Sequence, residues 1–146
     1  MNIAQIMSPN PAWVSPRTTV FDAALTMKLL DASMLPVCDH DCLVGTVTDW
    51  DIAIRAVATG WDARHTLIAD IMTAEPVCCF DDQEAVEAVQ IMHDHQFQRL
   101  PVLNRENHLV GIVSLEELTA FREDEATPGS VKENISAGGM PLFQAA

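Results

Sequence analysis

The segment from Val44 to Ile52, VGTVTDWDI, changes from an apolar, strand-like run to a polar turn within a few residues. The run ends at Thr48, and an acid, Asp51, stands three positions further on. A hydroxyl and an acid at this spacing are typical of a capping box, in which each side chain accepts a hydrogen bond from the other residue's backbone N–H group. The same two side chains could instead hold a ligand. The spacing alone favours the cap, because the pattern opens a great many helices.

The segment has a counterpart, VGIVSLEEL, at residues 110–118, and the match continues on both sides. Upstream, the offset between the two copies is constant at 71 − 6 = 65. The matched pairs include Ile6-Met7-Ser8 with Ile71-Met72-Thr73, Met27 with Met92, and Leu35-Pro36-Val37 with Leu100-Pro101-Val102. After a one-residue insertion the offset becomes 66, which aligns Thr48 with Ser114 and Asp51 with Glu117. Repeated units usually stack to bury their apolar faces, so we expect the two copies to form one domain.

Each copy predicts the same order of elements. An apolar pair such as Trp13-Val14 predicts a short strand, and apolar residues at helical spacing then predict a helix over residues 19–30 and over residues 83–95. Two apolar strands around a polar loop predict a hairpin, and a second helix is expected after each capping pattern. A glycine in each hairpin, Gly45 or Gly111, either lets another segment come close or marks a bulge. The unit is therefore β-α-β-β-α, and the predicted fold class is α/β (α+β).

The composition is that of a globular chain, with 49% hydrophobic and 20% charged residues among 146. Eight Lys and Arg against 21 Asp and Glu give a net charge of −13, which argues against nucleic acid and anionic lipid as partners. The chain begins without the basic segment of a signal peptide, and no stretch approaches the roughly 18 apolar residues of a membrane span. We therefore expect a cytoplasmic protein that contacts no membrane.

Together these motifs resemble those of the CBS domain family, whose members are small β-α-β-β-α modules that occur in pairs. The resemblance rests on IMS and IMT at the start of the copies, on LPV in both, and on the two strand-to-helix segments. It implies CBS repeats at residues 1–60 and 61–121, packed with pseudo-twofold symmetry as a Bateman module and similar to small stand-alone bacterial CBS-pair proteins. Residues 122–146 are expected to form a C-terminal tail that is either flexible or docks on a partner subunit.

The resemblance also implies a function. CBS pairs usually sense and regulate rather than catalyse, so we expect no enzymatic activity and no required cofactor. They often form homodimers, and many bind an adenosine-containing ligand such as AMP, ATP or S-adenosylmethionine in a cleft between the repeats. An effector protein, which the sequence does not identify, would respond to the bound ligand. The alternative is a ligand-free structural module that dimerises and presents a surface to a partner protein.

In ligand-binding relatives, each cleft joins the strand-to-helix turn of one repeat to the first two strands of the other. The contacts that this implies for the first cleft are Thr46, Thr48, Trp50, Asp51, Val77, Cys78, Phe97 and Arg99, and Arg55, one helical turn after Asp51, is a further candidate. Those of the second cleft are Ala12, Trp13, Ser33, Met34, Ser114 and Glu117. Asp51, which would hold the ribose, aligns with the longer Glu117, and Arg99 aligns with Met34. We therefore expect one competent site per chain and a degenerate second one.

The residues that could contact the ligand's phosphates can each be interpreted in more than one way. Arg55 either lies near the phosphates or pairs with Asp51 at i,i+4. Arg99 is either a phosphate contact or an ordinary surface arginine. Relatives often carry arginine where this chain has Trp50, and an aromatic ring can stack on adenine but cannot neutralise phosphate. A monophosphate or an adenosyl ligand with an uncharged tail is therefore favoured over a triphosphate.

The cysteines give weak support to metal or redox chemistry. They are Cys38, Cys42, Cys78 and Cys79. Cys38, His40 and Cys42 are close in sequence, but a structural zinc site needs four converging ligands, and no matching second pair follows. Catalysis by cysteine needs a paired histidine and an oxyanion donor, for which no motif is visible. Cys38 aligns with Leu103 of the other copy, so packing explains it, and we expect no metal site.

Overall fold

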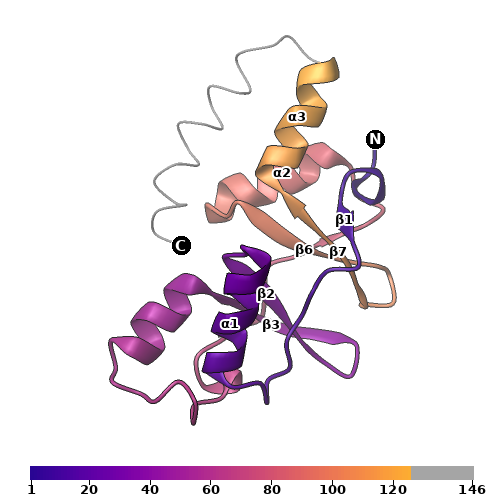
Figure 1. The fold of residues 1–146 in the computed structure, drawn as a ribbon. Coiled ribbons are helices and arrows are strands. Elements are labelled where there is room, and N and C mark those ends of the chain that lie inside the picture. The colour runs from indigo at the N-terminus through magenta and orange to yellow at the C-terminus, as the bar shows by residue number, and fades with distance from the viewer. Residues whose placement is uncertain (126–146) are drawn as a thin grey trace. The chain divides into compact units, whose positions relative to one another are not determined.

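Figure 1 shows the computed structural model of the chain, which describes residues 1–125. Most of the predicted tail, residues 126–146, lies outside the described residues, and so does its predicted flexibility or docking. Residues 122–125 belong to the last helix, α3 (Leu115–Glu125), which therefore runs past the predicted end of the second repeat. Among the helices of residues 1–125, none has the length and apolar character that crossing a membrane requires.

The chain divides into two compact units whose limits differ from those of the sequence copies. The first-copy unit consists of residues 12–76. The second-copy unit consists of residues 1–11 together with the described residues from 77 onward. The opening segment of each sequence copy, with its IMS or IMT motif, therefore belongs to the unit of the other copy. Each unit combines helices with one sheet, which confirms the predicted mixed α and β class.

The first-copy unit has a three-stranded antiparallel sheet in the order β2-β3-β4. Its strands are β2 (Met34–Asp39), β3 (Cys42–Thr48) and β4 (Thr73–Ala74). Helix α1 (Val20–Leu30) begins after Thr19, whose Oγ1 accepts a hydrogen bond from the N–H group of Asp22 at 3.1 Å. It ends at Asp31, which adopts the left-handed conformation. The predicted helix and the predicted hairpin are both confirmed in this unit.

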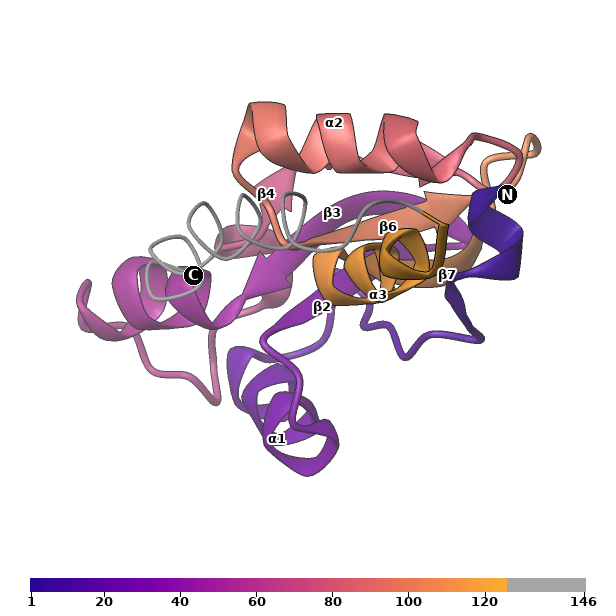
Figure 2. The ribbon, with the colours of Figure 1, turned by 90° about the horizontal axis from the view of Figure 1, so that it is seen from above.

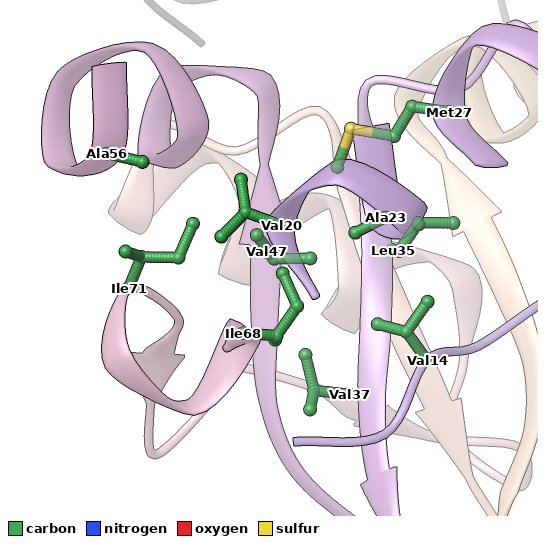
Figure 3. Close-up of a cluster of buried hydrophobic side chains, with 10 residues drawn as sticks. All are labelled: Val14, Val20, Ala23, Met27, Leu35, Val37, Val47, Ala56, Ile68 and Ile71. Atoms are coloured by element: carbon green, nitrogen blue, oxygen red, sulfur yellow. The ribbon is translucent and has the colours of Figure 1, made fainter. Parts of the chain in front are cut away.

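Buried apolar side chains, most of them from the helices and the hairpin, form the core of the first-copy unit. Figure 3 shows them converging between α1, the hairpin and the 3₁₀ helix η3 (Ile68–Asp70). They are Val14, Val20, Ala23, Met27, Leu35, Val37, Val47, Ala56, Ile68 and Ile71. Val20, Ala23 and Met27 recur at helical spacing, so α1 turns one apolar face to the core. Leu35 and Val37 are two residues apart on β2 and therefore point to the same side of the sheet.

The short strand predicted at Trp13-Val14 is reduced to a single bridge, in which Val14 lies parallel to Val37. Two backbone hydrogen bonds hold it, from the N–H group of Val14 to the Pro36 carbonyl at 3.0 Å and from that of Cys38 to the Val14 carbonyl at 2.9 Å. In the second copy the matching segment forms a strand, β5 (Cys79–Phe80). An apolar pair in the sequence predicts the position of this segment but not how far its pairing extends.

The helix that follows Thr48 is wider than an α-helix. Residues 51–57 form a π-helix, η2 (Asp51–Val57), and a hydrogen bond that spans five residues runs from the N–H group of Ala58 to the carbonyl of Ala53 at 2.9 Å. The counterpart in the second copy, α3, is an ordinary α-helix. A second helix is thus confirmed in both copies, but the capping pattern could not reveal its type, because a cap fixes only the first turn.

The second-copy unit has a four-stranded sheet in the order β1-β7-β6-β5. Its strands are β1 (Ser8–Pro9), β5, β6 (Arg99–Leu103) and β7 (Leu109–Ser114), and only β5 and β6 run parallel among the pairs described. Helix α2 (Ala85–His95) and α3 contact each other and lie against β6 and β7 (Figure 2). The buried core consists of Ile3, Cys79, Ala85, Ala88, Met92, Leu100, Val102, Val113 and Leu118.

Each opening segment adds a short strand to the hairpin of its unit, and a glycine permits the approach. A Cβ built on Gly45 of β3 would lie 2.7 Å from the Thr73 carbonyl oxygen of β4. A Cβ built on Gly111 of β7 would lie 2.9 Å from the Ser8 carbonyl oxygen of β1. Each hairpin also has a register shift beside its glycine. Both interpretations of the two glycines therefore hold, since a close approach and a bulge occur together.

Candidate functional site

The turn from β3 into η2 contains the capping box that the sequence predicts. The N–H group of Asp51 donates a hydrogen bond to Thr48 Oγ1 at 3.1 Å, and the N–H group of Thr48 donates one to Asp51 Oδ2 at 3.0 Å. The Asp51 residue is only 2% exposed. A carboxylate so buried and so oriented is rigidly placed, which suits it to hold a ligand as well as to start a helix.

The second oxygen of Asp51, Oδ1, is held less tightly. It accepts a hydrogen bond from Thr73 Oγ1 and forms an ion pair with Arg55 Nε, each at 3.4 Å. Both distances exceed the 2.7–3.2 Å that is usual for strong hydrogen bonds of this kind. Burial raises the pKa of the Asp51 carboxyl, and the hydrogen bonds from Thr48 and the charge of Arg55 offset part of that rise. Oδ1 is thus the oxygen whose present partners are held at the longer distances and are the easier to displace.

Hydroxyl groups gather around this carboxylate. Thr46 and Thr48 are two residues apart on β3 and share a face of the sheet, and Thr73 on β4 is paired directly with Thr46. Thr73 is a site residue that the sequence analysis missed. The available signal was the alignment of Ser8 with Thr73, which keeps a hydroxyl at the same place in both opening segments.

Arg55 pairs with Asp51 at i,i+4, which is one of the two alternatives that the sequence left open. Its Nε lies 3.4 Å from Asp51 Oδ1, and its Cζ lies 5.9 Å from the centre of the Trp50 ring. The Arg55 side chain is 47% exposed, whereas that of Asp51 is 3% exposed. The arginine therefore reaches inward from the surface to a buried acid and passes near an exposed aromatic ring.

The corresponding acid of the second-copy unit, Glu117, has closer hydrogen-bond donors on both of its oxygens. Glu117 Oε1 accepts hydrogen bonds from the N–H group and the Oγ of Ser114 at 3.0 and 2.9 Å, and its Oε2 accepts one from Ser8 Oγ at 3.0 Å. Ile112 occupies the position that Thr46 has in the first copy, so one hydroxyl is missing. Glu117 is half-buried and its close partners are internal, which leaves it less capacity for a ligand.

The remaining predicted contacts divide between the units. Val77, Cys78, Phe97 and Arg99 belong to the second-copy unit, and Ala12, Trp13, Ser33 and Met34 belong to the first-copy unit. Arg99 begins β6 opposite Ser114, and Phe97 stacks on His95 with ring centres 5.8 Å apart. Within one unit the structure brings together Thr46, Thr48, Trp50, Asp51 and Arg55. The clefts themselves, which would need residues of both units, stay predictions.

Residues 3–57 and residues 68–124 each match the CBS domain family. The chain belongs to this family. Among similar proteins, the CBS domain-containing protein YhcV of Bacillus subtilis is 36% identical over 135 residues, which cover 92% of this chain and 95% of YhcV. Uncharacterized protein YlbB of the same species is 33% identical over 138 residues, which cover 93% and 92%. The predicted likeness to small stand-alone CBS-pair proteins is therefore confirmed.

Solved CBS-pair structures share the fold, and some contain ligands. CBSX2 in complex with AMP is 25% identical with a TM-score of 0.74, and the match covers 84% of this chain and 96% of CBSX2. The CBS domain pair of MJ0100, in complex with 5-methylthioadenosine and S-adenosylmethionine, is 25% identical with a TM-score of 0.74, and the match covers 86% and 98%. CBS pairs of this size therefore bind adenosyl ligands in at least two relatives.

A third CBS-pair structure contains metal. Hypoxic Response Protein I with two coordinated zinc ions is 29% identical with a TM-score of 0.76, and the match covers 82% of this chain and 98% of that protein. In the part of the present chain that is described, no three His, Cys, Asp or Glu side chains gather in a metal-binding arrangement. Burial raises the pKa of Cys38 to about 11 and that of Cys79 to about 12, so both thiols stay protonated near neutral pH.

The cysteines of this CBS pair should differ sharply in reactivity. Cys42 is exposed at the tip of the first hairpin, whereas Cys38 and Cys79 are buried. Because thiolate is the reactive form and needs access, we expect iodoacetamide at pH 8 to label Cys42 first and the two buried cysteines only on unfolding. Mass spectrometry of the digested protein measures the order of labelling, with a sample alkylated in urea as the control. Equal labelling of Cys38 and Cys42 in the native protein would contradict the burial of Cys38.

Proposed function

We propose that this CBS pair is a regulatory module that binds one adenosine-containing ligand per chain, of the AMP, ATP or S-adenosylmethionine class, and that it is not an enzyme. The observation that carries the proposal is the Asp51 carboxylate, which is buried and oriented by its capping box while Oδ1 is held only at 3.4 Å. The adenosyl ligands of CBSX2 and MJ0100, two CBS pairs of the same fold, support the choice of ligand class.

The chemistry of a ribose suits this acid. Its two neighbouring hydroxyl groups are donors, and a carboxylate accepts from both. Hydrogen bonds to an ionised acceptor are roughly twice as strong as those between neutral groups. Thr46, Thr48 and Thr73 add hydroxyl groups that can donate or accept beside the acid. Asp51 is thus proposed to hold the ribose, and the three threonines are proposed to line the ribose-binding site.

The other parts of the ligand are assigned to residues near this ribose-binding site. The exposed ring of Trp50 is proposed to stack on adenine, and Arg55 to meet the part of the ligand beyond the ribose. Val77, Cys78, Phe97 and Arg99 of the second-copy unit remain proposed contributors. Trp50 stands where relatives often have arginine, and its ring cannot neutralise phosphate. A triphosphate is therefore the least suited of the three ligand types.

A single site per chain follows from the contrast between the two acids. Glu117 has close internal donors on both of its oxygens, and Ile112 replaces the hydroxyl of Thr46. The cluster around Ser114 and Glu117, with Trp13 and Met34 on the other side of the predicted cleft, is therefore proposed to be degenerate.

The second candidate function is a ligand-free structural module that dimerises or presents a surface to a partner protein. Exposed apolar side chains on α1, on η2 and just after η2 favour it, namely Leu25, Leu29, Ile54, Val57 and Trp61. The aligned positions of the second copy carry Gln90, Asp94, Ala120 and Glu123 for the first four of these. A homodimer in the cytoplasm, with its ligand state communicated to an effector protein, combines both candidates and is part of the proposal.

Titration calorimetry of the wild-type chain with AMP, ATP and S-adenosylmethionine tests the proposed function. We expect saturable binding of at least one of these ligands with a stoichiometry of one per chain. A parallel thermal unfolding series should show stabilisation of about 2.7 kcal/mol when the ligand is at a hundred times its dissociation constant. Two equal sites per chain would contradict the single-site proposal, and no binding together with no thermal shift would favour the structural module.

A further inference from the structure

We infer that Arg55 selects anionic adenosyl ligands, such as a nucleoside 5′-monophosphate, over neutral ones by leaving Asp51 when the ligand binds. The inference rests on the proposed function, since it concerns the same ribose-binding site at Asp51. The sequence left two alternatives for Arg55, pairing with Asp51 or contact with the phosphates, and the inference is that Arg55 does each in turn. Without ligand the guanidinium partners the buried acid, and with ligand it partners the phosphate.

The starting point is how the oxygens of Asp51 are occupied. Oδ2 accepts from the Thr48 backbone, and this bond also fixes the start of η2. Oδ1 accepts a hydrogen bond from Thr73 Oγ1 and forms an ion pair with Arg55 Nε, each at 3.4 Å. A carboxylate oxygen has about two lone-pair positions, so these two donors already use those of Oδ1. A ribose hydroxyl can therefore reach Oδ1 only if one of the two donors withdraws.

Arg55 is the donor that can withdraw with the least disturbance. Thr73 belongs to β4, which is paired with β3 and packs closely on Gly45. Arg55 is a long side chain, 47% exposed, and reaches Asp51 from the surface. Its aliphatic stem has several rotatable bonds, so the guanidinium can turn outward without moving the backbone.

The withdrawal of Arg55 makes the charge of the ligand matter. When the ribose takes Oδ1, the guanidinium loses its partner, and a neutral ligand supplies no replacement. The 5′-phosphate of a nucleotide is attached to the same sugar and offers a planar guanidinium a strong, bidentate partner. In a chain whose net charge is −13, a phosphate needs such a local cation to be held at all.

The other two arginines of the first-copy unit are engaged elsewhere, and the second copy has no arginine at the aligned position. Arg17 pairs with Asp39 at 3.2 Å, and Arg64 lies 4.1 Å from the centre of the Phe21 ring. The position that aligns with Arg55 in the second copy is 55 + 66 = 121, which is Phe121. The exchange of partners can therefore occur at Asp51 but has no counterpart at Glu117.

Calorimetry with AMP, adenosine and 5′-methylthioadenosine tests the inference in the full chain. Wild type should bind AMP about tenfold more tightly than either neutral nucleoside, the effect expected of one additional charge-assisted contact. Arg55→Gln should lower the affinity for AMP by a similar factor and leave the neutral nucleosides bound as well as before or better, so that the preference disappears. Arg55→Lys should retain part of the preference, which a purely structural role would not predict.

Arg64→Gln is the matched control, because it removes an exposed arginine of the same unit that does not contact Asp51, and it should keep the full preference. Urea unfolding of each variant confirms that the fold is retained. Equal affinities of wild type for AMP and adenosine, or a preference that persists in Arg55→Gln, would overturn the inference while the proposed function stands. If no adenosyl ligand binds wild type, both the proposed function and the inference are wrong.

Discussion

Asp51→Asn is expected to weaken binding of the adenosyl ligand about 100-fold while the chain still folds. The substitution keeps the shape of the side chain but replaces an ionised acceptor with an amide. Two hydrogen bonds from the ribose then lose their charge-assisted character, and each such bond contributes about 1.5–3 kcal/mol. Calorimetry with the ligand that wild type binds best measures the loss directly.

The fold should survive this substitution because its capping role does not require charge. The amide oxygen of asparagine can still accept from the Thr48 N–H group, the bond that Oδ2 now accepts at 3.0 Å. Glu117→Gln is the matched control, since it makes the same chemical change at the aligned acid of the second copy. It should leave ligand affinity unchanged. Unchanged affinity in Asp51→Asn, or an equal loss in both variants, would contradict the assignment of a single ribose-binding acid.

Gly45→Ala should reduce the free energy of unfolding by about 2 kcal/mol. The added methyl group would lie 2.7 Å from the Thr73 carbonyl oxygen and 3.0 Å from Met72 Sδ. The carbonyl belongs to the backbone of β4, which cannot yield as a flexible side chain can, so β4 must separate from β3. Gly111→Ala should have a similar effect through the Ser8 carbonyl oxygen of β1. Urea unfolding followed by circular dichroism measures both losses.

Gly60→Ala provides the comparison, because the cost there comes from the backbone alone. Gly60 has a φ of 83°, and among the described residues no atom would lie within 4 Å of its Cβ. We expect a loss of about 1 kcal/mol from the left-handed conformation. A smaller loss for Gly45→Ala than for Gly60→Ala would show that β4 does not press on β3 as the structure indicates.

Much of the fold could be predicted because local signals agreed with one another. Thr19 caps α1 where the helical pattern begins, and the polar loops of the hairpins lie between the predicted strands. What local signals could not give was the pairing of the opening segments. A constant offset between two copies is the same whether Thr73 pairs with its own copy or with the other, because the register of pairing is a non-local property.

The candidate site was predicted in part for the same reason. The pair Thr48 and Asp51 is local, so its spacing was sufficient to predict the capping box. Thr73 is distant in sequence and reaches Asp51 only through the strand pairing that local signals could not supply. The choice between the two positions of Arg55 depended on the burial of Asp51, since a buried carboxylate needs a partner more than an exposed one does.

The exchange of opening segments means that the duplicated stretch of sequence is not the piece that folds. A fragment made of residues 1–60 would contain Asp51 and all of β3 but not β4, and the edge of β3 beside Gly45 would be left uncovered. A fragment of residues 12–76 would contain the complete three-stranded sheet together with Thr73. After duplication, each half of such a chain depends on the leading residues of the other, so deletion of either copy removes a strand from the one that remains.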